Sequence, residues 1–157
     1  MDVLLVRHAI AEPADPGQPD SERPLSERGI ERFGQVVRAL ERIDLRIDSL
    51  QHSPLVRAVQ TADLMAPLLV GERVETELLA MPPSRPLLAG LAAERTALVG
   101  HEPWMSDLFS LLLTGSADHG ERFAMKKGAV AWLQGEPEPG GMNLVAHMPP
   151  RVLTPFA

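Results

Sequence analysis

The sequence predicts an α/β protein with a mostly parallel sheet that helices cover on both faces. Two observations support this. Short apolar runs alternate along the chain with segments whose apolar residues recur at helical spacing. Such alternation favours parallel strands joined by crossover helices. With 157 residues, 45% of them hydrophobic, the chain also has the size and composition of a single domain over residues 1–157.

Six segments are predicted to be strands. Val3–Val6 is a continuous apolar run that stops at Arg7, as expected for a strand buried on both faces. Thr96–Val99 has the same character and stops at Gly100. The other predicted strands are residues 47–51, 73–76, 129–133 and 143–146, with a turn rich in Pro and Gly at 135–141 between the last two.

Three helices are predicted between these strands. Ser26 is a suitable N-cap for the first, whose apolar face would be Ile30, Phe33, Val37 and Leu40. Ser53 and Pro54 offer a cap and a first-turn proline to the second, with Leu55, Ala58, Ala62, Met65 and Leu69 on its apolar face. Pro103 begins the third, with Trp104, Leu108, Leu111 and Leu112 on one side. Proline-rich loops are predicted at residues 12–24 and 81–86.

The composition excludes several classes of function. Fifteen Lys and Arg against 21 Asp and Glu give a net charge of −6, which argues against broad nucleic-acid binding. The absence of Cys excludes disulfides, zinc–thiolate sites and cysteine nucleophiles. The only apolar run near the N-terminus is too short for a signal sequence or a membrane span. We therefore expect a cytoplasmic protein that does not bind a membrane.

Polar side chains follow three of the predicted strands. Arg7 and His8 follow the first, His52 and Ser53 the second, and His101 the fourth. In parallel sheets, ligands bind beyond the carboxyl ends of the strands. These segments are therefore expected to meet at one edge and to form a site there.

These residue types suit phosphoryl transfer. A neutral imidazole is a good nucleophile near neutral pH, which makes His8 the candidate catalytic residue. The forked guanidinium groups of Arg7 and Arg57 match phosphate oxygens. His101, if protonated, would supply a further cationic donor. Ser53 is expected to cap its helix and to contact the phosphate as well.

Four further residues are ambiguous. Glu77 is the nearest candidate general acid, but an exposed surface carboxylate fits the sequence equally well. His52 is interpreted as a structural wall of the pocket. Lys126 and Lys127 precede a glycine and are interpreted as a solvated turn, with substrate steering as the alternative.

Four segments together resemble the histidine phosphatase superfamily. They are Arg7-His8-Ala9, residues 23–29 (RPLSERG), residues 53–62 (SPLVRAVQTA) and residues 99–103 (VGHEP), and they fall in the family's order. The short length is similar to that of the SixA-like phosphohistidine phosphatase branch. The resemblance implies a three-layer α/β/α sandwich, a nucleophilic His8, and a phosphate pocket of Arg7, Arg57 and His101. Ala9 stands where the family usually has Gly.

The resemblance also bears on the substrate. Longer members with mutase activity carry insertions over the pocket, for which this chain has no room. An open site and a phosphohistidine-bearing protein substrate are therefore expected, with small phosphoesters as the alternative.

Two other classes of function are considered. A non-catalytic phosphate-binding module would not need the nucleophile His8. A metallohydrolase could use His8, His52 and His101 as ligands, but adjacent arginines would repel the metal ion. We therefore predict no metal and no cofactor.

Overall fold

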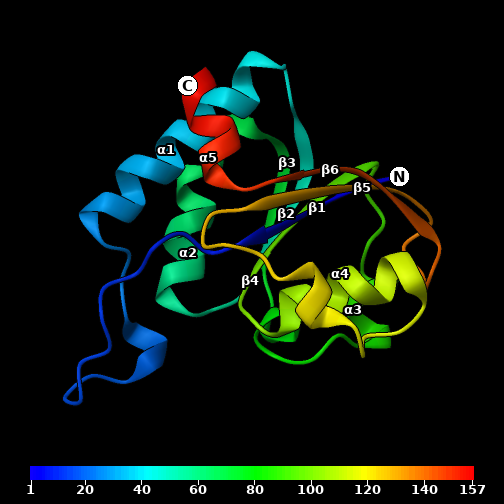
Figure 1. Cartoon of the computed structure of the whole chain (residues 1–157), viewed down its shortest axis with the longest axis horizontal. Helices are drawn as coiled ribbons and strands as arrows, with labels where there is room; N and C mark the ends of the chain where they lie inside the picture. Colours follow the sequence, from blue (N-terminus) through cyan, green and yellow to red (C-terminus); the bar gives the residue numbers. More distant parts are fainter.

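The computed structural model describes residues 1–157 and contains one six-stranded sheet in the order β3-β2-β4-β1-β5-β6 (Figure 1). Strands β3, β2, β4 and β1 are parallel, whereas β5 is antiparallel to both of its neighbours, β1 and β6. The bounds are β1 Asp2–Arg7, β2 Ile47–His52, β3 Leu69–Glu75, β4 Arg95–Gly100, β5 Val130–Gly135 and β6 Met142–Met148. The predicted mostly parallel sheet is confirmed.

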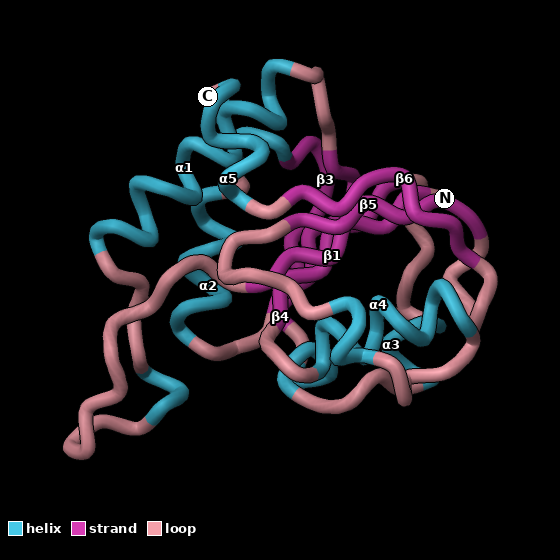
Figure 2. The backbone as a smooth tube through the Cα atoms, in the orientation of Figure 1, coloured by secondary structure: helices cyan, strands magenta, loops and turns pink.

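Helices cover both faces of this sheet, which confirms the three-layer α/β/α arrangement. Helices α1, α2 and α5 lie on one face and α3 and α4 on the other (Figures 1 and 2). Their bounds are α1 Glu27–Arg42, α2 Val56–Leu64, α3 Arg85–Ala89, α4 Trp104–Thr114 and α5 Pro150–Leu153. No helix combines the length and apolar character needed to cross a bilayer. The cytoplasmic location stays a prediction.

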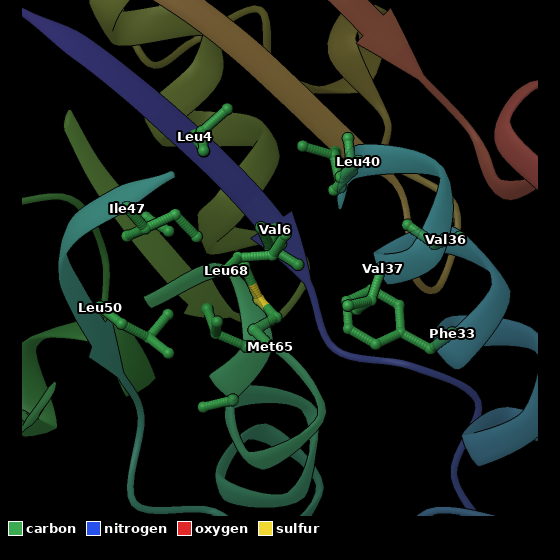
Figure 3. Close-up of a cluster of buried hydrophobic side chains, with 14 of the residues drawn as sticks. Leu4, Val6, Phe33, Val36, Val37, Leu40, Ile47, Leu50, Met65 and Leu68 are labelled. Carbon is green, nitrogen blue, oxygen red and sulfur yellow. The ribbon is translucent and has the colours of Figure 1, made fainter. Parts of the chain in front are cut away.

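Strand β1 contributes to both halves of the core. Leu4 and Val6 point into the cluster under α1 and α2, where they join Phe33 and Leu40 (Figure 3). The alternate residues Val3 and Leu5 belong to the cluster under α4. Because successive side chains point to opposite faces of a sheet, a strand covered on both faces must be apolar throughout. This explains the uninterrupted run at the start of the chain.

Three details of the helix predictions are wrong. Helix α2 begins at Val56 with Leu55 at the N-cap position, so Ser53 does not cap it. Leu69 lies in β3 and not on the face of α2. Ile30 is 43% exposed, because the apolar face of α1 centres on Phe33 and Leu40 instead.

Two short helices were not predicted. Helix α3 lies partly within the Pro-rich stretch, and α5 follows the last strand. In both helices a proline occupies one of the first two positions, where the missing N–H would have no intrahelical partner. A single turn of helix is too short to give a periodic apolar pattern.

The start of α1 packs against the chain that leaves β1. The Ser26 hydroxyl accepts a hydrogen bond from Gly29 N–H, as an N-cap should, and Ser26 N–H donates to the Ile10 carbonyl at 3.0 Å. Gly29 lies so close that a Cβ there would be 2.0 Å from the Ile10 oxygen. Only glycine allows this approach, which fixes the backbone two residues after His8.

Two glycine substitutions in α1 should have opposite effects on stability. Gly29→Ala should lower the free energy of unfolding by about 2–3 kcal/mol, since the new methyl group collides with backbone. Gly34→Ala should raise it by about 0.5–1 kcal/mol, since its nearest neighbour would be the flexible Arg38 side chain at 3.5 Å. Urea unfolding of both variants measures the difference. Equal effects would contradict the close approach at Gly29.

Candidate active site

The predicted polar segments meet at the carboxyl edge of the parallel strands. Arg7 and His52 end β1 and β2, and His101 directly follows β4. Two backbone hydrogen bonds extend the parallel ladders past the strands: His8 N–H donates to the Gly100 carbonyl at 3.0 Å and Ser53 N–H to the Val99 carbonyl at 3.1 Å. The sheet itself therefore holds these segments side by side.

The His8 side chain is buried, and its hydrogen bond fixes which nitrogen carries the lone pair. It is 5% exposed, and its Nδ1 lies 2.7 Å from the carbonyl oxygen of Ala9. A carbonyl can only accept, so Nδ1 carries the hydrogen and Nε2 keeps its lone pair. The predicted nucleophile His8 therefore has its free lone pair on Nε2.

Helix α2 also holds the backbone beside His8. Ala9 N–H donates to the Thr61 hydroxyl at 3.0 Å, and this hydroxyl donates to the Arg57 carbonyl at 2.6 Å. Both Ala9 and Thr61 are buried. The position of His8 is thus coupled to the helix that carries Arg57.

His101 packs beside His8, with 5.1 Å between the ring centroids. Its Nε2 lies 2.8 Å from the Ser53 hydroxyl, which also accepts a hydrogen bond from Leu55 N–H. The Ser53 hydroxyl can donate to Nε2 when the His101 ring carries its hydrogen on Nδ1, and it can accept from Nε2–H in the other tautomer. Ser53 therefore orients His101 rather than capping α2.

Burial keeps both rings neutral at physiological pH. Desolvation, followed by the charges of neighbouring groups, lowers the pKa of His8 to about 3. Desolvation, together with the charge of Arg57, lowers the pKa of His101 to about 4. A neutral His101 would act in the protein without substrate as a hydrogen-bonding group and not as a cation. The two arginines supply the positive charge instead.

Arg57 is 6% exposed and is paired with a residue that the sequence did not reveal. Its Nη2 lies 2.8 Å from Oδ2 of Asp20, and its Nη1 donates to the Asp20 carbonyl at 2.6 Å. Partial burial acts to raise the pKa of Asp20, but Arg23 and Arg57 outweigh it and lower that pKa. The sequence of the proline-rich loop does not predict this role for Asp20, because the ion pair joins residues 37 positions apart.

Arg7 reaches across to the segment before β5. Its Nη1 donates to the Met125 carbonyl at 2.6 Å. The Nε atoms of Arg7 and Arg57 and Nδ1 of His101 are three of the six buried side-chain polar atoms without a hydrogen-bond partner. A buried donor without an acceptor costs free energy, and a phosphoryl group would supply three acceptor oxygens. Arg7, Arg57 and His101, three of the predicted phosphate residues, are thus among those with an unpartnered polar atom.

His52 and Glu77 lie at the border of this group. His52 donates from Nδ1 to the Ser53 carbonyl at 2.9 Å and accepts at Nε2 from Arg73 Nε, also at 2.9 Å. Both ring nitrogens of His52 thus have structural partners, and its role as a wall of the pocket stays a prediction. Glu77 is the first residue of a short 3-10 helix, Glu77–Ala80, that packs on the end of β4. It is exposed and makes no hydrogen bond or ion pair with the site.

The metallohydrolase alternative finds little support in this geometry. No three His, Cys, Asp or Glu side chains are grouped so that they could hold a metal ion. Both ring nitrogens of His52, one of the three candidate ligands, are already engaged.

Comparison with known proteins agrees with this geometry. The family model of the histidine phosphatase superfamily (branch 1) matches residues 3–80, a range that includes His8 and Arg57. The chain belongs to the histidine phosphatase superfamily. An uncharacterised protein of Picosynechococcus sp. is 27% identical over 156 residues, which span 94% of this chain and 90% of that protein.

Solved structures share the fold of this histidine phosphatase. The protein histidine phosphatase SixA complexed with tungstate has a TM-score of 0.78 at 22% identity, with 96% of this chain and 98% of that chain covered. A phosphoserine phosphatase of Entamoeba histolytica, in complex with 3-phosphoglyceric acid, has a TM-score of 0.68 at 17% identity, with 94% and 96% covered. At these identities the likeness concerns the fold.

The two buried rings should resist protonation in solution. The imidazole signals of His8 and His101 should keep neutral-ring ¹⁵N shifts from pH 7 to about 5, whereas a histidine peptide titrates near ~6.5. The unfolded chain binds these protons and the folded chain does not, so the free energy of unfolding should fall as the pH drops from about 6.5 toward 4. NMR titration of labelled protein, with His8→Asn and His101→Asn to assign the signals, tests this. A midpoint near 6.5 for either ring would contradict the burial argument.

Proposed function

We propose that this histidine phosphatase dephosphorylates phosphohistidine on another protein, with His8 as the nucleophile, within one domain over residues 1–157. The observation that carries the proposal is the buried His8 ring. Its Nδ1 is fixed by the Ala9 carbonyl, which leaves the Nε2 lone pair for phosphorus. Neutrality of His8 at pH 7 makes that lone pair available without a general base.

In the first step His8 Nε2 attacks phosphorus in line with the departing group. A bond forms between Nε2 and phosphorus, and the bond from phosphorus to the substrate's ring nitrogen breaks. Its electron pair stays on that nitrogen, which takes a proton from solvent. The Nδ1 hydrogen bond to Ala9 persists and favours the positive charge that develops on the His8 ring.

Arg7, Arg57 and His101 provide the donors for the phosphoryl oxygens. Their unpartnered Nε and Nδ1 atoms would find acceptors there, and the two guanidinium groups would balance the negative charge of the oxygens. In the tautomer with its hydrogen on Nδ1, His101 would accept the Ser53 hydroxyl proton at Nε2 and donate from Nδ1 to the phosphoryl group. Asp20 holds the Arg57 guanidinium in a fixed orientation.

In the second step water attacks the phosphorus of phosphorylated His8. The N–P bond breaks, its electron pair returns to Nε2, and inorganic phosphate leaves with the oxygen of the water. The low pKa of His8 makes it a good leaving group, because its ring is most stable when neutral. No metal or cofactor is needed in either step.

The nature of the leaving group favours phosphohistidine. An alkoxide leaves poorly unless a placed acid protonates it, whereas imidazole leaves readily since its ring takes a proton near ~pH 6.5. Glu77, the only predicted acid, is exposed and is not tied to the site. The fold shared with SixA supports this choice, and the fold shared with a phosphoserine phosphatase makes phosphoesters the second candidate.

Loss of His8 should abolish turnover without unfolding the protein. We expect His8→Ala to lower kcat/KM for a phosphohistidine protein at least about 10³-fold, since the nucleophile is removed. Rapid acid-free quenching of the wild type should trap base-stable, acid-labile phosphate on one residue. His119→Ala, an exposed histidine outside the site, serves as the matched control. Near-normal activity of His8→Ala would refute this mechanism.

Dependence on Glu77 should separate the two substrate classes. Glu77→Gln should change phosphohistidine hydrolysis by less than about 2-fold, because that leaving group needs no placed acid. Comparison of kcat/KM on a phosphohistidine protein and on several sugar phosphates measures the preference. Glu72→Gln, an exposed carboxylate on β3, is the control. A preference for sugar phosphates by orders of magnitude, lost in Glu77→Gln, would establish the phosphoester alternative.

A further inference from the structure

A cavity lies beside the active site, on the side of β5 and β6. Its volume is about 830 Å³, and Arg7 forms part of its wall, whereas His8, Arg57 and His101 do not line it. The other polar lining residues come from α1, the segment before β5, the end of β6 and α5: Arg32, Lys126, Lys127, His147 and Arg151. No Asp or Glu lines it.

The charge of this cavity is opposite to that of the whole chain. The protein carries a net charge of −6 and only two lysines, and both of them, Lys126 and Lys127, line the cavity. These lysines, Arg32 and Arg151 take part in none of the five ion pairs of the structure. Partial desolvation lowers the pKa of His147, which disfavours its charged form. With Arg7, five cationic side chains and no carboxylate line the cavity, and such a concave positive surface attracts anions.

The two lysines are held at a fixed place relative to the nucleophile. They lie in a turn closed by a hydrogen bond of 2.8 Å from Ala129 N–H to the Lys126 carbonyl, with φ of +76° at Gly128. Gly128 N–H donates to the carbonyls of both Arg7 and His8, at 3.1 and 3.0 Å. An anion held by the lysines is therefore positioned with respect to the phosphoryl group on His8.

The rest of the lining indicates what kind of anion fits. Ile10, Pro149, Pro150 and Val152 give the cavity apolar walls beside the cations. A lone phosphate would fill a small part of about 830 Å³ and would leave these apolar surfaces uncovered. A polypeptide segment with acidic and apolar side chains matches both kinds of wall.

We propose that this cavity is the docking site for an acidic segment of the substrate protein, next to the phosphohistidine that enters the site at His8. This proposal rests on the proposed function. The cations would attract the partner and speed its association, and Arg7 would link the docked segment to the transferred phosphoryl group.

Two synthetic phosphohistidine peptides test the proposal. One carries four Glu residues beside the phosphohistidine, and the other has Gln at the same positions. The wild type should show a kcat/KM at least about 10-fold higher for the Glu peptide, and this ratio should fall toward 1 as salt is raised. In Lys126→Glu/Lys127→Glu the ratio should be about 1 or lower. Arg38→Glu/Arg42→Glu changes the charge by the same amount on exposed residues of α1 outside the cavity and should keep the wild-type ratio.

Two further measurements keep the outcome decisive. Thermal unfolding shows whether Lys126→Glu/Lys127→Glu folds. If it does not, Lys126→Gln/Lys127→Gln is used instead, and it should fold because these exposed side chains make no hydrogen bond or ion pair. Fluorescence anisotropy with the unphosphorylated Glu peptide measures docking without turnover. If neither peptide is hydrolysed but the Glu peptide still binds in a way that depends on the lysines, the phosphohistidine activity is refuted. The docking site would still be supported. Equal kcat/KM for both peptides, or equal preference in the lysine variant, would overturn the docking site.

Discussion

The active site depends on how the backbone of residues 7 and 8 is held. This backbone is bound on both sides: His8 N–H donates to Gly100 of β4, and the carbonyls of Arg7 and His8 both accept from Gly128 before β5. Ala9 N–H is tied to Thr61 of α2. His8, His101 and the turn that carries Lys126 and Lys127 therefore share one hydrogen-bonded backbone frame. A group placed this way needs little reorganisation during reaction.

Burial and charge act together on this frame. Desolvation lowers the pKa of both histidines, so the two arginines are the positive charges of the site near pH 7. Asp20 is the only carboxylate that pairs with either guanidinium group. In a chain with a net charge of −6, such a site can attract a phosphoryl group only because the cations are gathered locally. The cavity around Lys126 and Lys127 extends the same positive field toward β6.

Ser53 illustrates how a local rule can be overridden by packing. Its position before Pro54 gave it the features of a helix cap, yet the helix begins at Val56. Its N–H continues the ladder to Val99, and its hydroxyl is used by His101 and Leu55 N–H. The N–H and hydroxyl of Ser53 thus make buried hydrogen bonds at the edge of the sheet instead of capping α2.

The sequence by itself determined the layered fold and the residues that gather at the sheet edge. Both follow from local features: apolar runs such as Val3–Val6 specify buried strands, and the carboxyl ends of parallel strands share an edge. The pairing of Arg57 with Asp20, the burial that lowers the pKa of His101 and the hydrogen bonds between the lysine turn and His8 emerge only from the folded structure. These depend on contacts between residues far apart in the chain and on burial, and neither leaves a periodic signal in the sequence.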